Sequence, residues 1–154
     1  MLAWEIKFFS ELSALRLYQV LKLRQDVFIL EQGCLYADAD DLDQKAIHIL
    51  LISEEEDDLF AYCRILPAEL VYPEVAIGRV VVSKAARDQG FAKKLMQKSI
   101  RFVEQEMQAP AIKISAQSHL QAFYQSLGFC VASKPFDEDG IEHIEMILHN
   151  KNII

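Results

Sequence analysis

Apolar residues follow two different spacings along the chain, and these spacings predict strands and helices in alternation. Short apolar or alternating runs predict strands over residues 4–9, 48–53, 59–66, 75–82, 111–117, 129–133 and 142–148. Longer segments with near-helical spacing predict one helix from Ser10 or Ser13 to Phe28, one over 92–107 and a short one over 119–127. Strands dominate both ends of the chain, so the fold class is α/β with a mixed sheet.

Turn residues separate these elements without any sign of a second domain. A charged EEEDD run at 54–58 joins two predicted strands as a hairpin, and Gly78 interrupts a strand where a β-bulge is expected. Gly128 follows the short helix as a left-handed C-cap. Because the sequence has neither repeats nor a low-complexity linker, residues 1–154 are predicted to form one domain.

The composition is that of a globular protein. Of the 154 residues, 52% are apolar and 25% are charged, and no apolar run approaches the roughly 20 residues that cross a bilayer. The first residues, MLAWEIKFFSEL, lack the basic region and long apolar segment of a signal peptide, so we expect a cytoplasmic location and no membrane partner. A net charge of −7 argues against nucleic-acid binding and favours a cationic substrate.

The cysteines and the acidic residues give no metal-binding pattern. Cys34, Cys63 and Cys130 lie far apart without a CxxC pair, which argues against a disulfide framework or a zinc site. The acidic segment DADDLD at 38–43 lacks the mid-loop glycine and final glutamate of an EF-hand loop. We therefore expect no metal, and we expect this segment to be a solvated acidic face that attracts an amine.

The segment RDQGFAKKL at 87–95 stands between a predicted strand and a predicted helix. Its R-x-x-G-x-A pattern has neither the glycine spacing of a dinucleotide-binding loop nor the GxxxxGK[ST] of a P-loop. A helix N-terminus still offers backbone N–H groups and the positive end of the helix dipole to a phosphate, and Arg87 and Lys93 add charge. By itself the segment fits a phosphate site and an ordinary loop equally well.

A second segment, HLQAFYQSLGF at 119–129, places Tyr124 on the short predicted helix, where a tyrosine is usually a core residue with its hydroxyl at the rim. Together, R-x-x-G-x-A and the later Y-x-x-x-G-F, each in its strand and helix context, resemble the GNAT superfamily of N-acetyltransferases. LRQDVFILEQ, GRVVVS and AQSHLQAFYQSLGF are similar to the ElaA-like subgroup of that superfamily. The resemblance covers nearly the whole chain.

The resemblance implies one GNAT-like domain with a mixed, mostly antiparallel sheet of about six to seven strands, flanked by helices. It also implies that acetyl-CoA, the acyl donor, binds where the strands over 75–82 and 111–117 splay apart. Tyr124 is then the general acid for the departing CoA thiolate. The residues assigned to CoA, through its pantetheine arm and pyrophosphate, are Val80, Val81, Val82, Arg87, Asp88, Gln89, Gly90, Phe91, Ala92, Lys93 and Gln117.

The acceptor side is less sharply defined. An amine must lose a proton before it attacks a thioester, yet the strand over 75–82 lacks the glutamate that often acts as base in this family. The candidate substrate residues are Glu31, Gln32, Arg79 and His119, and the candidate bases are Glu31, His48 and His119. Arg79 fits equally well as the ion-pair partner of an acid across the sheet, and a histidine at a strand start is more often structural.

The leading hypothesis is an acyl-CoA-dependent N-acyltransferase that moves acetyl to a primary amine of a small molecule or peptide by direct attack in a ternary complex. A non-catalytic module that binds acyl-CoA or a partner protein is the alternative. An acyl-homoserine-lactone synthase is a weaker alternative, because the chain is short and its R-x-x-G-x-A pattern is clear. The fold does not define the acceptor, and a homodimer through a terminal strand is compatible with the pattern.

Overall fold

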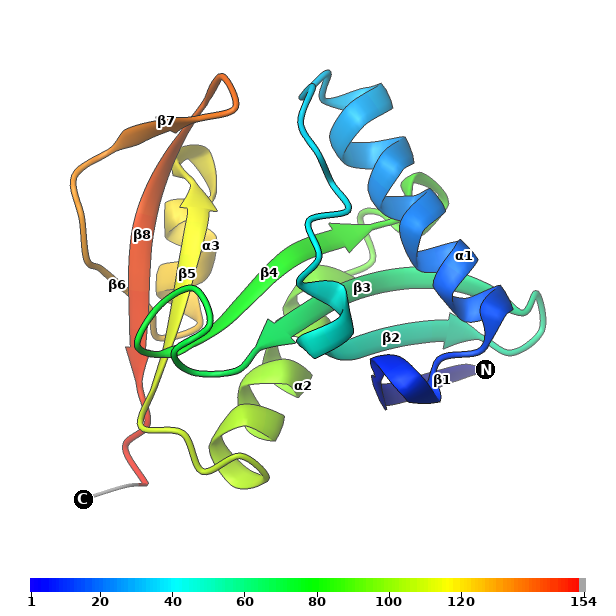
Figure 1. Ribbon diagram of the computed structural model, residues 1–154, viewed down its shortest axis with the longest axis horizontal. Coiled ribbons are helices and arrows are strands. Elements are labelled where there is room, and N and C mark those ends of the chain that lie inside the picture. Colours follow the sequence, from blue (N-terminus) through cyan, green and yellow to red (C-terminus); the bar gives the residue numbers. More distant parts are fainter. Residues whose placement is uncertain (153–154) are drawn as a thin grey trace.

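Within residues 1–152, which the computed structural model describes, every strand joins one eight-stranded sheet (Figure 1). The spatial order is β1-β2-β3-β4-β5-β8-β6, with β7 paired to β8, and in this range β4 and β5 form the one parallel pair. The strands are β1 (Leu2–Phe8), β2 (Ile47–Ser53), β3 (Asp58–Leu66), β4 (Val75–Val82), β5 (Ala111–Gln117), β6 (Cys130–Val131), β7 (Phe136–Glu138) and β8 (Ile141–His149).

Helices cover both faces of the sheet, with α1 on one face of β1–β4 and α2 on the other (Figure 1). Of the two predicted helix starts, Ser13 is the cap, because its Oγ accepts a hydrogen bond from Arg16 N at 3.1 Å. The helices are α1 (Ala14–Arg24), continued by the π-helical turn η2 (Gln25–Glu31), then α2 (Phe91–Gln105) and α3 (Gln121–Ser126). Short 3-10 turns are η1 (Phe9–Glu11), η3 (Asp43–Lys45), η4 (Lys84–Ala86) and η5 (Ser118–Leu120).

Alternation along the central strands gives the sheet two apolar faces. On the α2 face, Leu95 and Met96 are fully buried against residues such as Ile49 and Ile65. On the α1 face, apolar residues of α1 and η2 pack against β2, β3 and β4; this cluster contains Val20, Leu23, Val27, Leu50, Ile52, Leu59, Tyr62 and Val81. Burial on both faces fixes the strand register, since a slip by one residue would exchange the two faces.

The strands β4 and β5 diverge after a short contact, and their divergence creates the site described below. They pair only at Val75 with Ile112 and at Ala76 with Lys113. On its other edge β4 carries a bulge immediately after Gly78, because Gly78 opposes Arg64 whereas Val81 opposes Tyr62. The divergence is visible where β4 and β5 run apart toward their C-terminal ends (Figure 1).

The C-terminal region differs from its predicted pattern. The expected strand over 129–133 shrinks to β6, since Ser133 accepts a hydrogen bond from Glu145 N through its side chain and Pro135 has no N–H to donate. Residues expected only as a turn form β7, so the sheet has eight strands instead of six to seven. The helix α2 ends at Gln105, two residues before the predicted end, and 119–127 divides into η5 and α3. Across residues 1–152, no helix has the length and apolar character needed to span a membrane.

Candidate active site

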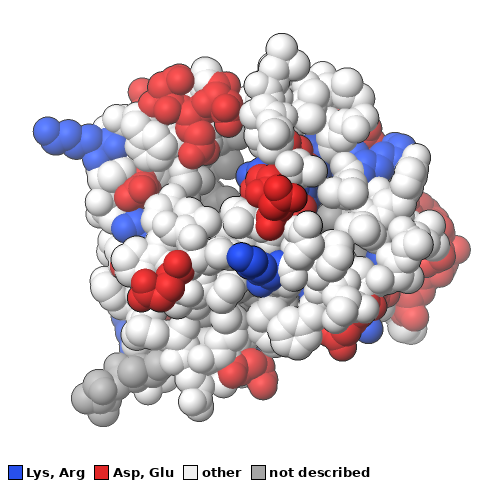
Figure 2. Space-filling view, viewed as in Figure 1, with Lys and Arg blue, Asp and Glu red and all other residues white. Residues whose placement is uncertain are grey.

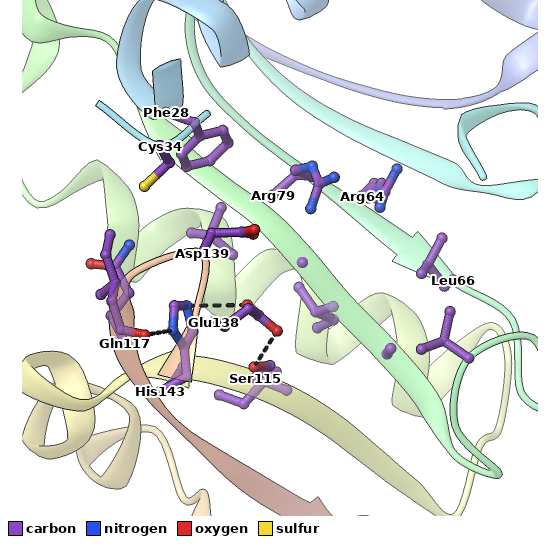
Figure 3. Close-up of a pocket in the computed structure, with 18 of the residues that line it drawn as sticks. Phe28, Cys34, Arg64, Leu66, Arg79, Ser115, Gln117, Glu138, Asp139 and His143 are labelled. Atoms are coloured by element: carbon purple, nitrogen blue, oxygen red, sulfur yellow. Dashed lines mark hydrogen bonds and ion pairs between the residues drawn. The ribbon is translucent and has the colours of Figure 1, made fainter. Parts of the chain in front are cut away.

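A cavity of about 340 Å³ opens where β4 and β5 diverge. Its walls come from β3, β4 and β5, from the segments after α1 and before β4, from α3 and from the β7–β8 hairpin. Figure 2 shows a hollow at this side of the molecule, and Figure 3 shows residues that line the cavity. Of the site residues predicted from the sequence, the cavity is lined by Gln32, Arg79, Val80, Gln117 and Tyr124. The divergence of two strands thus brings together residues that lie far apart in the chain.

Tyr124 reaches this cavity from α3. Its side chain is buried, with a relative exposure of 7%, and its ring packs edge-on against Phe123 and Phe129. Burial raises the pKa of Tyr124 to about 12, so the hydroxyl keeps its proton at neutral pH. Among the described residues the hydroxyl has no hydrogen-bond partner, which leaves it available to a ligand in the cavity.

The segment expected to hold a phosphate forms the start of α2. Gly90 precedes the helix with a φ of +76°, a conformation that favours glycine. The first intrahelical bond runs from Lys94 N to Gly90 O at 3.2 Å, so the amides of Phe91, Ala92 and Lys93 have no acceptor within the helix. Space above Gly90 is open, since a Cβ there would meet no atom within 4 Å. The arrangement has the features of an anion-binding helix start.

Two of the residues assigned to the cofactor have their side chains in the core. Phe91 is buried and packs against Phe60 with ring centroids 6.0 Å apart. Val81 packs into the apolar cluster on the α1 face, whereas Val80 lines the cavity. The two neighbours differ because successive side chains of a strand point to opposite faces of the sheet.

Two contacts tie η2 and the residue after it to the opening between β4 and β5. Arg87 binds Glu31 through two hydrogen bonds, of 2.5 and 2.8 Å, and this interaction lowers the pKa of the exposed Glu31 carboxyl. Gln117 Nε2 donates to Gln32 Oε1 at 3.3 Å. Both contacts join a residue predicted for the cofactor to one predicted for the acceptor.

The acidic segment 38–43 is not the solvated face that the sequence predicted. Asp38 and Asp43 are buried and, with Asp40, they pair with three arginines; we refer to this group as the arginine–aspartate network, which comprises Arg24, Arg64, Arg79, Asp38, Asp40 and Asp43. Although burial alone would raise the pKa of Asp40, its hydrogen bonds and charge contact with Arg64 lower the pKa to about 2. Arginines from α1, β3 and β4 therefore neutralise three of the four aspartates of the segment, while Asp41 is exposed.

Arg24 lies at the centre of the network with no exposed surface. Its Nε donates to Asp38 Oδ2 at 2.9 Å, its Nη1 to Asp43 Oδ1 at 2.7 Å and its Nη2 to Asp38 O at 2.8 Å. Arg79, expected either to face the acceptor or to pair with an acid across the sheet, pairs with Asp38 and Asp40 and also lines the cavity. Its guanidinium also stacks over Tyr36, 5.1 Å from the ring centroid.

The histidines proposed as bases lie outside the cavity. His48 is fully buried, and its ring nitrogens lie 2.7 Å from Tyr62 Oη and 2.9 Å from Asp43 O. Burial lowers the pKa of His48, as expected for a structural imidazole in the core. His119 is exposed on η5 and does not line the cavity.

Sequence reasoning missed a titratable pair on the β7–β8 hairpin. His143 Nε2 lies 3.2 Å from Glu138 Oε2, and both residues line the cavity (Figure 3). The available signal was the strand IEHIEMIL: Ile144, Met146 and Leu148 enter the core, so His143 must face the other way. In residues 1–152, no group of three or more His, Cys, Asp or Glu is placed to hold a metal ion.

Comparisons with known proteins agree with this fold. The acetyltransferase (GNAT) domain family matches residues 34–149. Protein ElaA of Escherichia coli is 39% identical over 146 residues, which cover 95% of each chain. A UPF0039 protein of Synechocystis is 40% identical over 144 residues, which cover 94% of this chain and 93% of the relative.

Solved structures show the same similarity in three dimensions. The crystal structure of Escherichia coli ElaA matches with a TM-score of 0.89 and covers 97% of this chain and 100% of that one. An acyl-CoA N-acyltransferase from Pseudomonas aeruginosa matches with a TM-score of 0.90 at 36% identity, over 96% of this chain and 99% of that one. The matches cover most of the chain, and they identify it as a member of the GNAT acetyltransferase family, similar to ElaA.

Proposed function

We propose that this chain is an acyl-CoA-dependent N-acyltransferase that transfers acetyl from acetyl-CoA to a primary amine of a small molecule or peptide. The observation that carries the proposal is Tyr124, which lines the cavity between β4 and β5 with a hydroxyl that no described residue binds. The amine attacks the thioester directly in a ternary complex. The proposal therefore requires no covalent intermediate on the chain.

The residues around the cavity fit acetyl-CoA as the acyl donor. Beyond Ala76, the edge of β4 that faces β5 has no strand partner within residues 1–152, so its backbone can pair with the amides of a pantetheine arm near Val80. The backbone amides of residues 88–93 at the start of α2 would hold the pyrophosphate, and Gly90 leaves the space above them open. Arg87 would exchange its contact with Glu31 for a phosphate oxygen.

Tyr124 supplies the proton that the departing thiolate needs. Burial raises its pKa to about 12, so the hydroxyl carries its proton and can donate it when the thiolate departs. Arg79 and Val80, at the bulge of β4, are outside the register with β3, and a backbone N–H there is a candidate donor to the tetrahedral oxyanion. The collapse of that intermediate breaks the C–S bond, and the sulfur takes the Tyr124 proton.

The experiment combines CoA binding with thiol release. Calorimetry with CoA gives the affinity, and a thiol reagent follows acetyl-CoA turnover with ethanolamine, putrescine, lysine methyl ester and a short peptide as acceptors. We expect CoA binding, a melting temperature raised by acetyl-CoA, and release of free CoA with at least one amine. Tyr124→Phe should lower kcat roughly 100-fold, the range for one general acid, and leave the Kd for CoA within about twofold.

Tyr18→Phe is the matched control, because Tyr18 is 68% exposed on α1 and remote from the cavity. It should leave both kcat and CoA binding unchanged. No binding signal at millimolar CoA would end the proposal. CoA binding without thiol release across a broad amine panel would favour the non-catalytic acyl-CoA sensor.

A further inference from the structure

The β7–β8 hairpin brings an imidazole and a carboxylate to the wall of the cavity opposite β4. His143, on β8, has a relative exposure of 8%, and Glu138, on β7, lies at the solvent side with a side-chain exposure of 47%. Glu138 Oε1 also lies 3.5 Å from Ser115 Oγ on β5 (Figure 3). Three strands therefore fix the pair at the wall of the cavity that Tyr124 also lines.

The backbone determines which nitrogen of His143 carries the hydrogen in the neutral ring. Nδ1 lies 2.8 Å from Ile141 O, which can only accept, so Nδ1 is the donor. The lone pair is consequently on Nε2, the nitrogen that lies near Glu138 and the cavity. Once Nε2 takes a proton, Glu138 Oε2 at 3.2 Å stabilises the charged ring.

The surroundings of the pair favour a cationic acceptor. Acidic side chains gather over the β7–β8 turn at the rim of the hollow (Figure 2), and Glu138 and Asp139 line the cavity itself. On the opposite wall the arginine–aspartate network contains three arginines and three aspartates, so it offers no net charge. A protonated amine is thus drawn toward the hairpin, where Glu138 and Nε2 of His143 lie.

The other titratable groups are less suitable as bases. Asp40 is paired with Arg64 and Arg79, and its pKa of about 2 makes it a weak proton acceptor. Glu31 is held by Arg87 and does not line the cavity. The titratable and charged residues that share the cavity with His143 are Cys34, Tyr36, Asp40, Arg64, Tyr72, Arg79, Tyr124, Glu138 and Asp139.

We propose that His143 is the general base that deprotonates the acceptor amine and that Glu138 positions the ammonium group and the protonated imidazole. The inference rests on the proposed acyltransferase function. Nε2 of His143 removes one proton from the ammonium group and passes it through Glu138 to solvent. The neutral amine forms the C–N bond, and its second proton leaves by the same route.

The proton balance is complete with Tyr124. Breakage of the C–S bond leaves a thiolate, which receives the Tyr124 proton, and the phenolate regains a proton from solvent. The sum is an ammonium group and an acyl thioester converted into an amide, a thiol and one released proton. No metal, oxidant or further reactant is required.

The test measures kcat/KM from pH 6 to 9.5 with acetyl-CoA and the most active amine of the panel, together with CoA affinity and thermal melting. His143→Gln should lower kcat/KM roughly 100-fold at pH 7, a typical contribution of a general base. The deficit should shrink about tenfold per pH unit as hydroxide replaces the base. A merely structural role would lower the rate by the same factor at every pH.

Glu138→Gln and His149→Gln complete the set. Glu138→Gln changes an exposed residue and should fold, with kcat/KM about tenfold lower at pH 7 and CoA affinity unchanged. His149→Gln is the matched control on the same strand, because His149 is exposed and outside the cavity. It should keep the wild-type profile.

The outcomes separate this inference from the proposed function. If the wild type is active and the folded His143→Gln variant has a kcat/KM within threefold of it at pH 7, the inference is wrong and the proposed function stands. The same holds if kcat/KM of the variant is lowered by an equal factor at every pH. If His143→Gln does not fold, Glu138→Gln decides: a deficit at pH 7 that closes at high pH supports the inference, and an unchanged profile overturns it. A wild type without CoA binding or turnover would overturn both proposals.

Discussion

The cavity has two charged walls that are built in opposite ways. On the side of α1, β3 and β4, the arginine–aspartate network buries its charges, and Arg24 has no exposed surface. On the β7–β8 side, the His143–Glu138 pair is half open to solvent, with His143 buried and Glu138 exposed. In the arginine–aspartate network the charged groups pair with one another, whereas the His143–Glu138 pair leaves a proton acceptor accessible from the cavity.

This difference separates charges that hold the fold from charges that can react. Removal of one member of a buried ion pair leaves an uncompensated charge in a medium of low polarity. A pair at a cavity edge can bind and release protons because water and substrate reach it. Titratable groups at a cavity therefore need to be sorted by their partners before any of them is assigned a chemical role.

The largest expected effect on stability comes from replacing Arg24 in the arginine–aspartate network. Arg24→Met preserves much of the side-chain volume but leaves Asp38 and Asp43 without their shared guanidinium. We expect the free energy of unfolding to fall by about 3–5 kcal/mol, measured by urea denaturation. Lys22→Met is the control, because Lys22 pairs with Asp26 at the surface, where the two side chains are 60% and 42% exposed, and it should lower the free energy of unfolding far less. Equal losses in the two variants would remove the distinction.

A smaller effect is expected for the pH-dependent stability that Asp40 of the arginine–aspartate network contributes. The folded pKa of Asp40 is about 2, below the ordinary 3.8, so the unfolded chain binds this proton first as the pH falls. The resulting stabilisation is complete above about pH 4 and is lost between about pH 4 and 2. Because the Asp40 side chain is 24% exposed, we discount the shift to about 1 kcal/mol.

Urea unfolding of Asp40→Asn at pH 5, 4, 3 and 2.5 measures this contribution. The variant should be less stable than the wild type at pH 5, and the difference should narrow toward pH 2.5. Asp41→Asn is the control, since Asp41 is exposed and asparagine also tolerates its φ of +64°. A difference that stays constant with pH would show that the Asp40 carboxylate contributes no pH-dependent stability.

The two walls also differ in how well the sequence predicted them. Local patterns were sufficient for the elements: the alternation at 111–117 became β5, and Ser13 became the cap of α1. The pairing of the acidic segment was not visible, because Arg24 and Asp43 are 19 residues apart and only the tertiary fold brings them together. A run of aspartates looks solvated until its arginines are located.

The His143–Glu138 pair was not predicted from the sequence for a related reason. The turn at Asp139 and Gly140 was expected, but β7 was not, and β7 is the strand that sets Glu138 beside His143. Tyr124 was found because its spacing to Gly128 belongs to a resemblance that covers the chain, whereas no comparable motif contains His143. A motif predicted Tyr124 from the sequence, whereas the fold was needed to place His143 at the same cavity.

Glu31→Gln tests a third kind of charge pair, one at the mouth of the cavity. The change weakens the two hydrogen bonds that hold Arg87, which then meets a phosphate with less competition. We expect CoA affinity to rise about two- to fivefold, an effect below about 1 kcal/mol, with unchanged thermal stability. Calorimetry at two salt concentrations measures it, and Glu11→Gln, remote from the cavity, is the control. Weaker CoA binding would mean that Glu31 itself helps to hold the ligand.

The smallest expected effect is that of a substitution in the His143–Glu138 pair on the free energy of unfolding. Glu138→Gln should change the free energy of unfolding by less than about 0.5 kcal/mol, because its side chain is 47% exposed. Asp43→Asn is the matched change in the arginine–aspartate network, where it removes a carboxylate shared by Arg24 and Arg64. It should lower the free energy of unfolding several times more. Urea denaturation at pH 7 compares the two directly. If Glu138→Gln were as destabilising as Asp43→Asn, the His143–Glu138 pair would stabilise the fold as the arginine–aspartate network does. Its position at the cavity would then no longer indicate a role in proton transfer.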